Sequence, residues 1–125
     1  MEWNVSVTEI ESRHTEQSKI HTDECSQILK SIASDAFVIA LDERGKALPS
    51  RELASKIQNL QNDGQSKLQF IIGGADGLND EIRGRADFLL SFGMQTWPHM
   101  LARVMLLEQI YRAQQILKNH PYHRD

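Results

Sequence analysis

The sequence predicts a single α/β domain, residues 1–125, with a mostly parallel sheet flanked by helices. Two short apolar runs, residues 37–41 and 68–72, have the length and composition of strands that are covered on both faces. Apolar stripes with helical spacing stand before, between and after these runs. Strands that alternate with helices in this way are typical of a parallel sheet with helices on its faces. A chain of 125 residues also has the size of one domain with its own core.

The first half of the chain is expected to begin with a half-buried strand, because apolar and polar residues alternate over residues 3–7. Residues 11–19 are polar and are expected to form a loop or the frayed start of a helix. An apolar stripe predicts a helix over residues 25–34. The strand at residues 37–41 follows, and residues 42–45 are expected to form a turn.

The second half of the chain begins with a helix that Ser50 is expected to cap and Gly64 to end, since these residue types favour those positions. The further expected elements are a strand at residues 68–72, a short helix at residues 80–86, a strand at residues 88–91 and a long helix at residues 99–118. Pro98 sets the start of the long helix, because proline cannot lie in a helix interior.

Composition excludes several classes of protein. The longest apolar run, residues 36–41, is far shorter than the roughly 20 residues that span a membrane, and no signal peptide opens the chain. The single cysteine, Cys25, excludes an internal disulfide and a cysteine zinc cluster, and it is typical of a reducing compartment. The formal net charge of −3 argues against a protein that coats nucleic acid. We therefore expect a cytoplasmic protein with no membrane segment and no metal.

The long C-terminal helix is apolar on more than one side, and its polar residues do not share one face. Such a helix has to be covered twice. In so small a domain the sheet can cover one side, and a second copy of the chain is expected to cover the other. The sequence therefore predicts a homodimer, and a helix sandwiched inside the monomer is the alternative.

Three loops follow strands and are expected to meet at the carboxyl edge of the sheet, where parallel sheets bind ligands: residues 41–45, 73–78 and 92–98. The glycines of the second loop permit close approach to a ligand, but their spacing is neither a dinucleotide fingerprint nor a P-loop. A tight strand-to-helix turn explains them equally well. The third loop is apolar, so either a bound heterocycle or a second subunit is expected to cover it.

The last residues, 119–125, combine a phenol, two imidazoles and a guanidinium, which suit phosphate contact and base stacking. A frayed terminus is the alternative interpretation. Arg112 has the spacing for an i,i+4 ion pair with Glu108, and His99 by itself is a surface or capping residue.

Four stretches together resemble a known family. They are VIALDERGK at residues 38–46, FIIGGADGL at 70–78, WPHMLARVMLLEQIYRA at 97–113 and HPYHR at 120–124. Their combination is similar to the ribosomal RNA large-subunit methyltransferase H family, SPOUT-class enzymes that methylate N3 of a pseudouridine in 23S rRNA. The resemblance extends over residues 36–125.

The resemblance implies a SPOUT-like sheet with a C-terminal trefoil knot, S-adenosylmethionine held in that knot, and an active site completed across a homodimer. The residues that it assigns to the cofactor are Leu41, Gly73, Phe92, Gly93, Met94, Gln95, Thr96 and Trp97. The residues that it assigns to catalysis and to contact with large-subunit rRNA in the ribosome are Arg112, Tyr122, His123, Arg124 and, close by, His99. His123 is the expected general base for the N3 proton, and Arg112 is expected to stabilise the ring anion or to hold phosphate.

The sequence departs from the family at its beginning. Members normally carry a strand and a helix of about thirty residues before the segment that residues 3–11 resemble, and the resemblance implies that this N-terminal unit is missing. A misplaced start codon, a natural truncation and a divergent, inactive member are the three explanations. A catalytically impaired SPOUT-like scaffold that binds cofactor or ribosome without turnover is therefore the alternative function. A nucleotide-binding regulator is a weaker interpretation, because the loop at residues 73–77 has no lysine.

Overall fold

The computed structural model describes residues 3, 5–10, 12, 15–74, 77–93, 95, 97–119 and 122–123. Within these residues the elements are α1 (Gln17–Ser31), β1 (Phe37–Ala47), α2 (Ser50–Asn62), β2 (Leu68–Ile71), α3 (Asp80–Arg85), β3 (Phe88–Ser91) and α4 (His99–Leu117). The strands form a parallel sheet in the order β2-β1-β3. The expected α/β class with a parallel sheet and flanking helices is confirmed.

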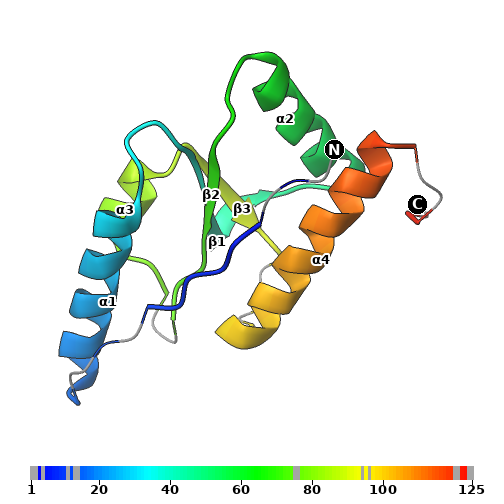
Figure 1. The fold of residues 1–125 in the computed structure, drawn as a ribbon. Helices are drawn as coiled ribbons and strands as arrows, with labels where there is room; N and C mark the ends of the chain where they lie inside the picture. The colour runs from blue at the N-terminus through cyan, green and yellow to red at the C-terminus, as the bar shows by residue number, and fades with distance from the viewer. Residues whose placement is uncertain are drawn as a thin grey trace.

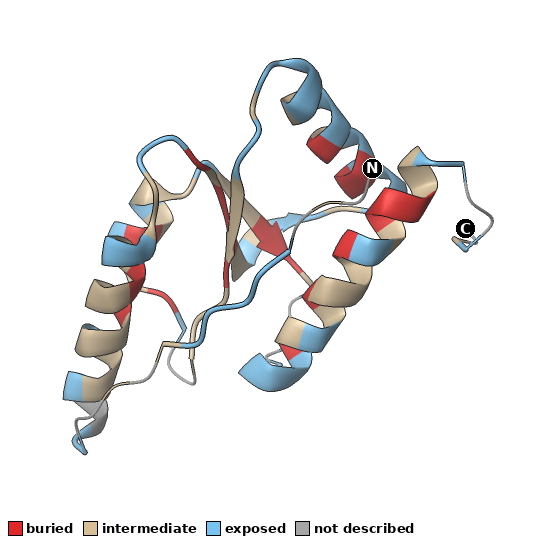
Figure 2. Ribbon diagram, in the orientation of Figure 1, coloured by how far each residue is buried: buried red, intermediate tan, exposed pale blue. Residues whose placement is uncertain are grey.

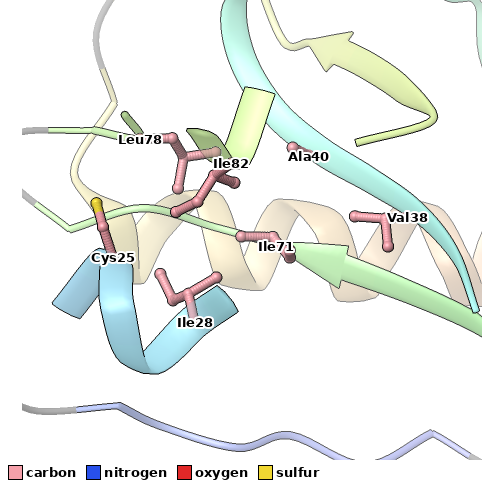
Figure 3. Packing of buried hydrophobic residues seen from close by; sticks show 7 residues of the cluster. All are labelled: Cys25, Ile28, Val38, Ala40, Ile71, Leu78 and Ile82. Carbon is pink, nitrogen blue, oxygen red and sulfur yellow. The ribbon is translucent and has the colours of Figure 1, made fainter. Parts of the chain in front are cut away.

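The helices lie on both faces of the sheet, α1 and α3 on one and α2 and α4 on the other (Figure 1). Strand β1 buries alternate residues in two cores, which explains its continuous apolar sequence. Val38 and Ala40 belong to the core under α1 and α3, with Cys25 among its members (Figure 3). Ile39 belongs to the core under α2 and α4. Buried residues accordingly line the inner sides of the helices (Figure 2).

Strand β1 is longer than the sequence predicted. We expected a turn at residues 42–45, but the strand continues to Ala47, and its pairing with β3 shifts register between Leu41 and Lys46. Residues 42–45 therefore form a bulge inside the strand. A bulge re-aims side chains at a sheet edge, and here it lies beside the loops that were expected to bind a ligand.

The predicted strand at residues 3–7 is wrong for the part of it that the structure describes. Residues 3 and 5–10 are extended but belong to no strand, and Val5 and Val7 are about half exposed, at 50% and 52%. An alternating pattern makes a strand only when a neighbouring backbone pairs with it. The segment instead packs Ile10 against the first core and pairs Glu9 with Arg103 of α4.

The helix boundaries differ from the predictions by a few residues. Helix α1 begins at Gln17 and ends at Ser31, earlier than expected at both ends. Ser50 is the first residue of α2 rather than its N-cap, and its hydroxyl donates to Gln109 Oε1 of α4 at 2.7 Å. Gly64 has a φ of +89° just beyond the end of α2, as predicted for a C-terminal stop.

Helix α4 packs one side against α2 and the sheet and leaves another side open. Ala102, Leu106 and Ile110 are buried, whereas Met100 and Val104 are exposed. The alternative in which α4 is sandwiched within one chain is therefore wrong for the described residues. Among those residues, no helix combines the length and apolarity that crossing a membrane requires.

Candidate functional site

The carboxyl edge of the sheet contains a cavity of about 800 Å³, which lies within the usual size range of cofactor sites. Residues 41–44 of β1, the glycine loop that follows β2 and the loop that follows β3 all line it. The first turns of α4 add His99 and Ala102 to its wall. The three loops were expected to bind a ligand because they follow the carboxyl ends of strands, and they do surround one cavity.

Most of the residues expected to bind a cofactor lie around this cavity. The lining includes Leu41, Gly73, Phe92, Gly93, Gln95 and Trp97. The other two candidates, Met94 and Thr96, lie outside the described residues. The lining mixes apolar side chains with backbone groups and charged side chains of both signs, a composition that accepts a ligand with a flat heterocycle and a charged end.

The glycine loop folds back on itself at the cavity wall. Gly77 N donates to Gly74 O at 3.0 Å, and Gly77 has a φ of +72°. A Cβ atom on Gly73 would stand 2.7 Å from the carbonyl carbon of Gly77, so only glycine fits there without movement. Helix α1 supports the loop from outside, with His21 Nε2 at 3.2 Å from Gly77 O and Glu24 directly behind Gly74.

The bulge of β1 is held by an ion pair that the sequence did not reveal. Asp42 Oδ2 accepts a hydrogen bond from Arg83 Nε of α3 at 2.9 Å, and the two side chains are only 8% and 20% exposed. Asp42 Oδ1 accepts from the backbone N of Arg44 at 2.8 Å. Both partners of the ion pair line the cavity, so the pair fixes the wall that follows Leu41.

The apolar loop after β3 is closed by its own hydrogen bonds. Ser91 Oγ lies 2.9 Å from Gly93 O and accepts from Gly93 N at 3.0 Å, with Gly93 at a φ of +112°. The indole of Trp97 donates to Phe92 O at 3.3 Å. Trp97 remains 38% exposed, so the apolar loop is not fully covered within one chain.

The residues expected to act on the substrate separate into two groups at opposite ends of α4. His99 lies at the N-terminus of the helix beside the cavity, and Arg112 lies thirteen positions further on. At about 1.5 Å per residue this is roughly 20 Å along the helix. Figure 1 shows the chain leaving α4 at the end far from His99. A single chain therefore does not bring the described tail residues, Tyr122 and His123, to the cavity.

At that far end Tyr122 and His123, which belong to the C-terminal tail, pack back on α4. Arg112 forms the expected i,i+4 pair with Glu108, with Nη2 at 2.8 Å from Oε2 and Nε at 3.2 Å from Oε1. Tyr122 donates its hydroxyl hydrogen bond to Glu108 Oε2 at 2.7 Å. Arg112 Nη1 lies 3.0 Å from His123 Nδ1. Arg124, the remaining candidate, lies outside the described residues.

The pKa values in this cluster respond to these contacts. Hydrogen bonding from Arg112 holds the pKa of Glu108 below its ordinary value, although partial burial opposes it. The hydrogen bond to Glu108 raises the pKa of Tyr122, and the same carboxylate raises the pKa of Arg112. Glu108 is therefore ionised at neutral pH while Tyr122 and Arg112 keep their protons.

Sequence reasoning missed the residues that act through distant partners. The role of Arg83 could not be recognised from local spacing, because its partner Asp42 lies 41 positions earlier. The same holds for His21, which lies 56 positions from Gly77. Asp42 could have been found, because it directly follows a predicted strand at the ligand-binding edge. No group of three or more potential metal ligands occurs in the part of the chain that the structure describes.

Comparison with known proteins gives consistent matches over nearly the whole chain. Residues 1–123 match the family model described as "Predicted SPOUT methyltransferase". The chain is 46% identical over 123 residues to the Ribosomal RNA large subunit methyltransferase H of Rhodospirillum centenum, covering 98% of this chain and 81% of that protein. It is 50% identical over 121 residues to the protein of the same name from Phenylobacterium zucineum, covering 97% and 75%.

Proposed function

Because the chain belongs to the ribosomal RNA large subunit methyltransferase H family of SPOUT methyltransferases, we propose that it methylates N3 of a pseudouridine in 23S rRNA with S-adenosylmethionine as donor. The observation that carries the proposal is the single cavity shared by the three loops at the carboxyl edge of the sheet. Such a protein works where ribosomes are made, so we also propose a cytoplasmic location.

The cavity suits S-adenosylmethionine in size and in chemistry. Leu41, Phe92 and Trp97 supply apolar surface for the adenosine, and the backbone of Gly73 can approach it closely. Asp42 and Glu43 bring carboxylates to the wall, and Arg44 and Arg83 bring guanidinium groups, so the wall offers charges of both signs to the amino-acid end of the donor, which carries an ammonium and a carboxylate. When bound, S-adenosylmethionine supplies an electrophilic methyl group on a sulfonium sulfur.

The trefoil knot also belongs to this proposal. The family resemblance implies it, and it would draw the loop at residues 92–98 towards the glycine loop. Such threading would place both loops on the wall of one cavity, and both loops do line one cavity. Knots are exceptional among protein folds, and this one would serve to enclose the donor on several sides.

The tail would supply the substrate side of the site. N3 of pseudouridine carries a proton that has to leave before the nitrogen can accept a methyl group, and His123 is our candidate for the general base that takes it. A nearby cation that stabilises the ring anion lowers the barrier. Arg112 is our candidate for this role, and Tyr122 offers a ring on which a base can stack. His123 and Arg124 would contact the RNA, and His99 would face the reaction from the cavity side.

We further propose that the site is completed across a homodimer. Within one chain roughly 20 Å of helix separates His99 from Arg112. Met100, Val104 and Tyr111 are exposed, and on a helix of 100° per residue they lie within about 40° of one another. Two copies that pack these faces antiparallel would carry the tail of one chain to the cavity of the other.

The experiment that tests the function measures binding and turnover separately. Calorimetry with S-adenosylmethionine is expected to show one site per chain. Incubation with ribosomes that lack the modification is expected to release S-adenosylhomocysteine and to leave a methylated pseudouridine, detected by mass spectrometry of digested rRNA. Binding without methylation would mean an impaired scaffold and would overturn the enzymatic proposal. An absence of binding would remove the donor site itself.

A further inference from the structure

The turn between Gly74 and Gly77 is a part of the cavity wall that needs contacts to hold it. Both residues line the cavity, and Gly77 has a φ of +72°. Glycine loses more backbone freedom on folding than any other residue, so a glycine turn stays closed only when other contacts stabilise it. One such contact lies within the turn, where Gly77 N donates to Gly74 O at 3.0 Å.

The chain on either side of this turn is anchored. Ile71 at the end of β2 and Leu78 after the turn are both buried in the core under α1 and α3. Asn79 then caps α3, because its side chain accepts a hydrogen bond from Ile82 N at 3.0 Å. The turn therefore has fixed ends, and the position of its middle depends on what else it contacts.

Helix α1 supplies a contact from outside. Cys25 and Ile28 of α1 pack in the core beside the turn (Figure 3). His21 lies four residues before Cys25, so it continues the same face of the helix beyond the core. Instead of an apolar contact it makes a polar one, with Nε2 at 3.2 Å from Gly77 O. Glu24 shares this face, and a Cβ atom on Gly74 would stand 2.9 Å from its Oε1.

The direction of the hydrogen bond follows from the acceptor. A backbone carbonyl has lone pairs and no proton, so His21 Nε2 has to be the donor to Gly77 O. This assignment is made from the partner and not from an observed hydrogen, and the charged ring and one neutral tautomer both satisfy it. Gly77 is thus bonded at its N–H by Gly74 and at its carbonyl by α1.

We propose that His21 is a positioning residue for the donor site, which holds the turn of the glycine loop closed through Gly77 O. This inference rests on the proposed function, since the cavity is taken to bind S-adenosylmethionine. Of the described residues, Gly77 lines the cavity and His21 does not, so His21 acts from behind the wall. A wall that is already held in place loses less freedom when the ligand binds, which raises affinity without a new contact.

The first part of the test measures the turn itself in the full-length protein without ligand. His21→Leu removes the donor, whereas His21→Gln keeps an N–H donor at similar reach. Lys30→Leu, at an exposed position nine residues later on α1, is the matched control. Amide hydrogen exchange of Gly77 by NMR reports how often its bond to Gly74 O opens. Exchange should be about threefold to tenfold faster in His21→Leu, as for the loss of one hydrogen bond, and close to wild type in the other two variants.

The second part measures the donor site by calorimetry. His21→Leu should weaken S-adenosylmethionine binding by about threefold to tenfold, and His21→Gln should recover most of this loss. The free energy of unfolding, from urea denaturation, should be similar in His21→Leu and His21→Gln, because neither substitution alters the core. A general weakening of α1 would lower stability and affinity together, and it would not be relieved by glutamine.

Three outcomes would overturn the inference. Unchanged exchange of Gly77 in His21→Leu would show that His21 does not hold the turn. Wild-type affinity in His21→Leu, in a protein that binds S-adenosylmethionine, would show that the donor site does not depend on it. Equal losses in His21→Leu and His21→Gln would remove the donor role of the side chain. Failure of the proposed function would instead appear in the wild-type protein, which would then bind no S-adenosylmethionine, while the exchange of Gly77 would still report on His21.

Discussion

Gly45 of β1 packs directly against the backbone of Leu89 of β3, so that a Cβ atom at position 45 would stand 2.5 Å from the Leu89 carbonyl carbon. The backbone at Leu89 cannot move without disturbing the strand pairing. Gly45→Ala is therefore expected to lower the free energy of unfolding by about 1–3 kcal/mol, the usual cost of overpacking. Urea denaturation followed by circular dichroism measures this change.

The control for this substitution is Gly84→Ala in α3, where a Cβ atom would meet nothing within 4 Å. Alanine is favoured over glycine in a helix by about 1 kcal/mol, so this variant should be as stable as wild type or more stable. A Gly45→Ala protein as stable as Gly84→Ala would show that the bulge can rearrange and would contradict the prediction.

We expect a substitution at Gly73 to affect ligand binding, because its close neighbour Gly77 belongs to the cavity wall. A Cβ atom at position 73 would lie 2.7 Å from the Gly77 carbonyl carbon, and relieving that contact has to move the glycine loop. Gly73→Ala should weaken S-adenosylmethionine binding by about tenfold or more, equivalent to about 1.4 kcal/mol. Calorimetry measures the affinity, with Gly84→Ala again as control. Wild-type affinity in Gly73→Ala would mean that the loop does not contact the donor.

We expect substitutions of Arg83 and of Asp42 to have strongly coupled effects on stability. Arg83→Met leaves a nearly buried carboxylate without its cation, which should cost about 2–3 kcal/mol of stability. The double variant with Asp42→Asn should lose less than the sum of the two single variants. The exposed pair of Lys67 and Asp35 is the control, and Asp35→Asn there should change stability by less than about 1 kcal/mol. Additive effects at Arg83 and Asp42 would contradict the assigned interaction.

These residues also show which features of the fold could be predicted from the sequence. The apolar run at residues 37–41 predicted a strand covered on both faces, and Val38 and Ile39 are indeed buried in two different cores. The turn at residues 42–45 was inferred from local composition, which cannot distinguish a turn from a bulge. The reason for Gly45 is its contact with a strand more than forty positions later, and no local pattern records such a contact.

The candidate site was likewise predictable only where a local pattern in the sequence selects its residues. Leu41 and Gly73 could be selected because both follow predicted strands at the edge where parallel sheets bind ligands. Glu108 was visible only as half of an i,i+4 pair, since its bond to Tyr122 depends on how the tail folds back. The resemblance to a family supplied the roles of the tail residues, which composition and spacing alone did not contain.

The docked tail should respond to pH at both ends of the scale. The pKa of Glu108 is lowered from 4.5, so the stabilisation of the docked tail by the Glu108 carboxylate is complete above pH 4.5 and is lost as the pH falls through the lowered value. The pKa of Tyr122 is raised from 10.0, so the stabilisation by the Tyr122 hydroxyl is complete below pH 10 and is lost as the pH rises through the raised value. The NMR signals of the Tyr122 ring should report undocking in both directions.

The control for this pH response is Glu108→Gln. Because glutamine does not titrate, this variant should lose the acid-dependent step while the protein stays folded. An acid-dependent step of wild-type size in Glu108→Gln would assign the transition to another group and would contradict the prediction.

The exposed face of α4 gives the last prediction. Val104 is 61% exposed in the single chain and lies between Met100 and Tyr111 on the face that we assign to the second subunit. Val104→Asp would bury a charge at that interface, so it should convert a dimer to monomers in analytical ultracentrifugation and abolish methyl transfer. Ser55→Asp, at an exposed position of α2, is the control and should leave the assembly unchanged.

A complementation experiment tests whether the second subunit contributes to the site. A Gly73→Ala chain has a damaged cavity and an intact tail, whereas a His123→Ala chain has the reverse. If the tail of one chain meets the cavity of the other, a mixed dimer contains one intact combination, and co-expression should raise methylation above the level that either variant supports alone. If the tail served its own chain, every combination in the mixed dimer would carry one defect. No recovery despite formation of mixed dimers would therefore exclude a site shared between subunits.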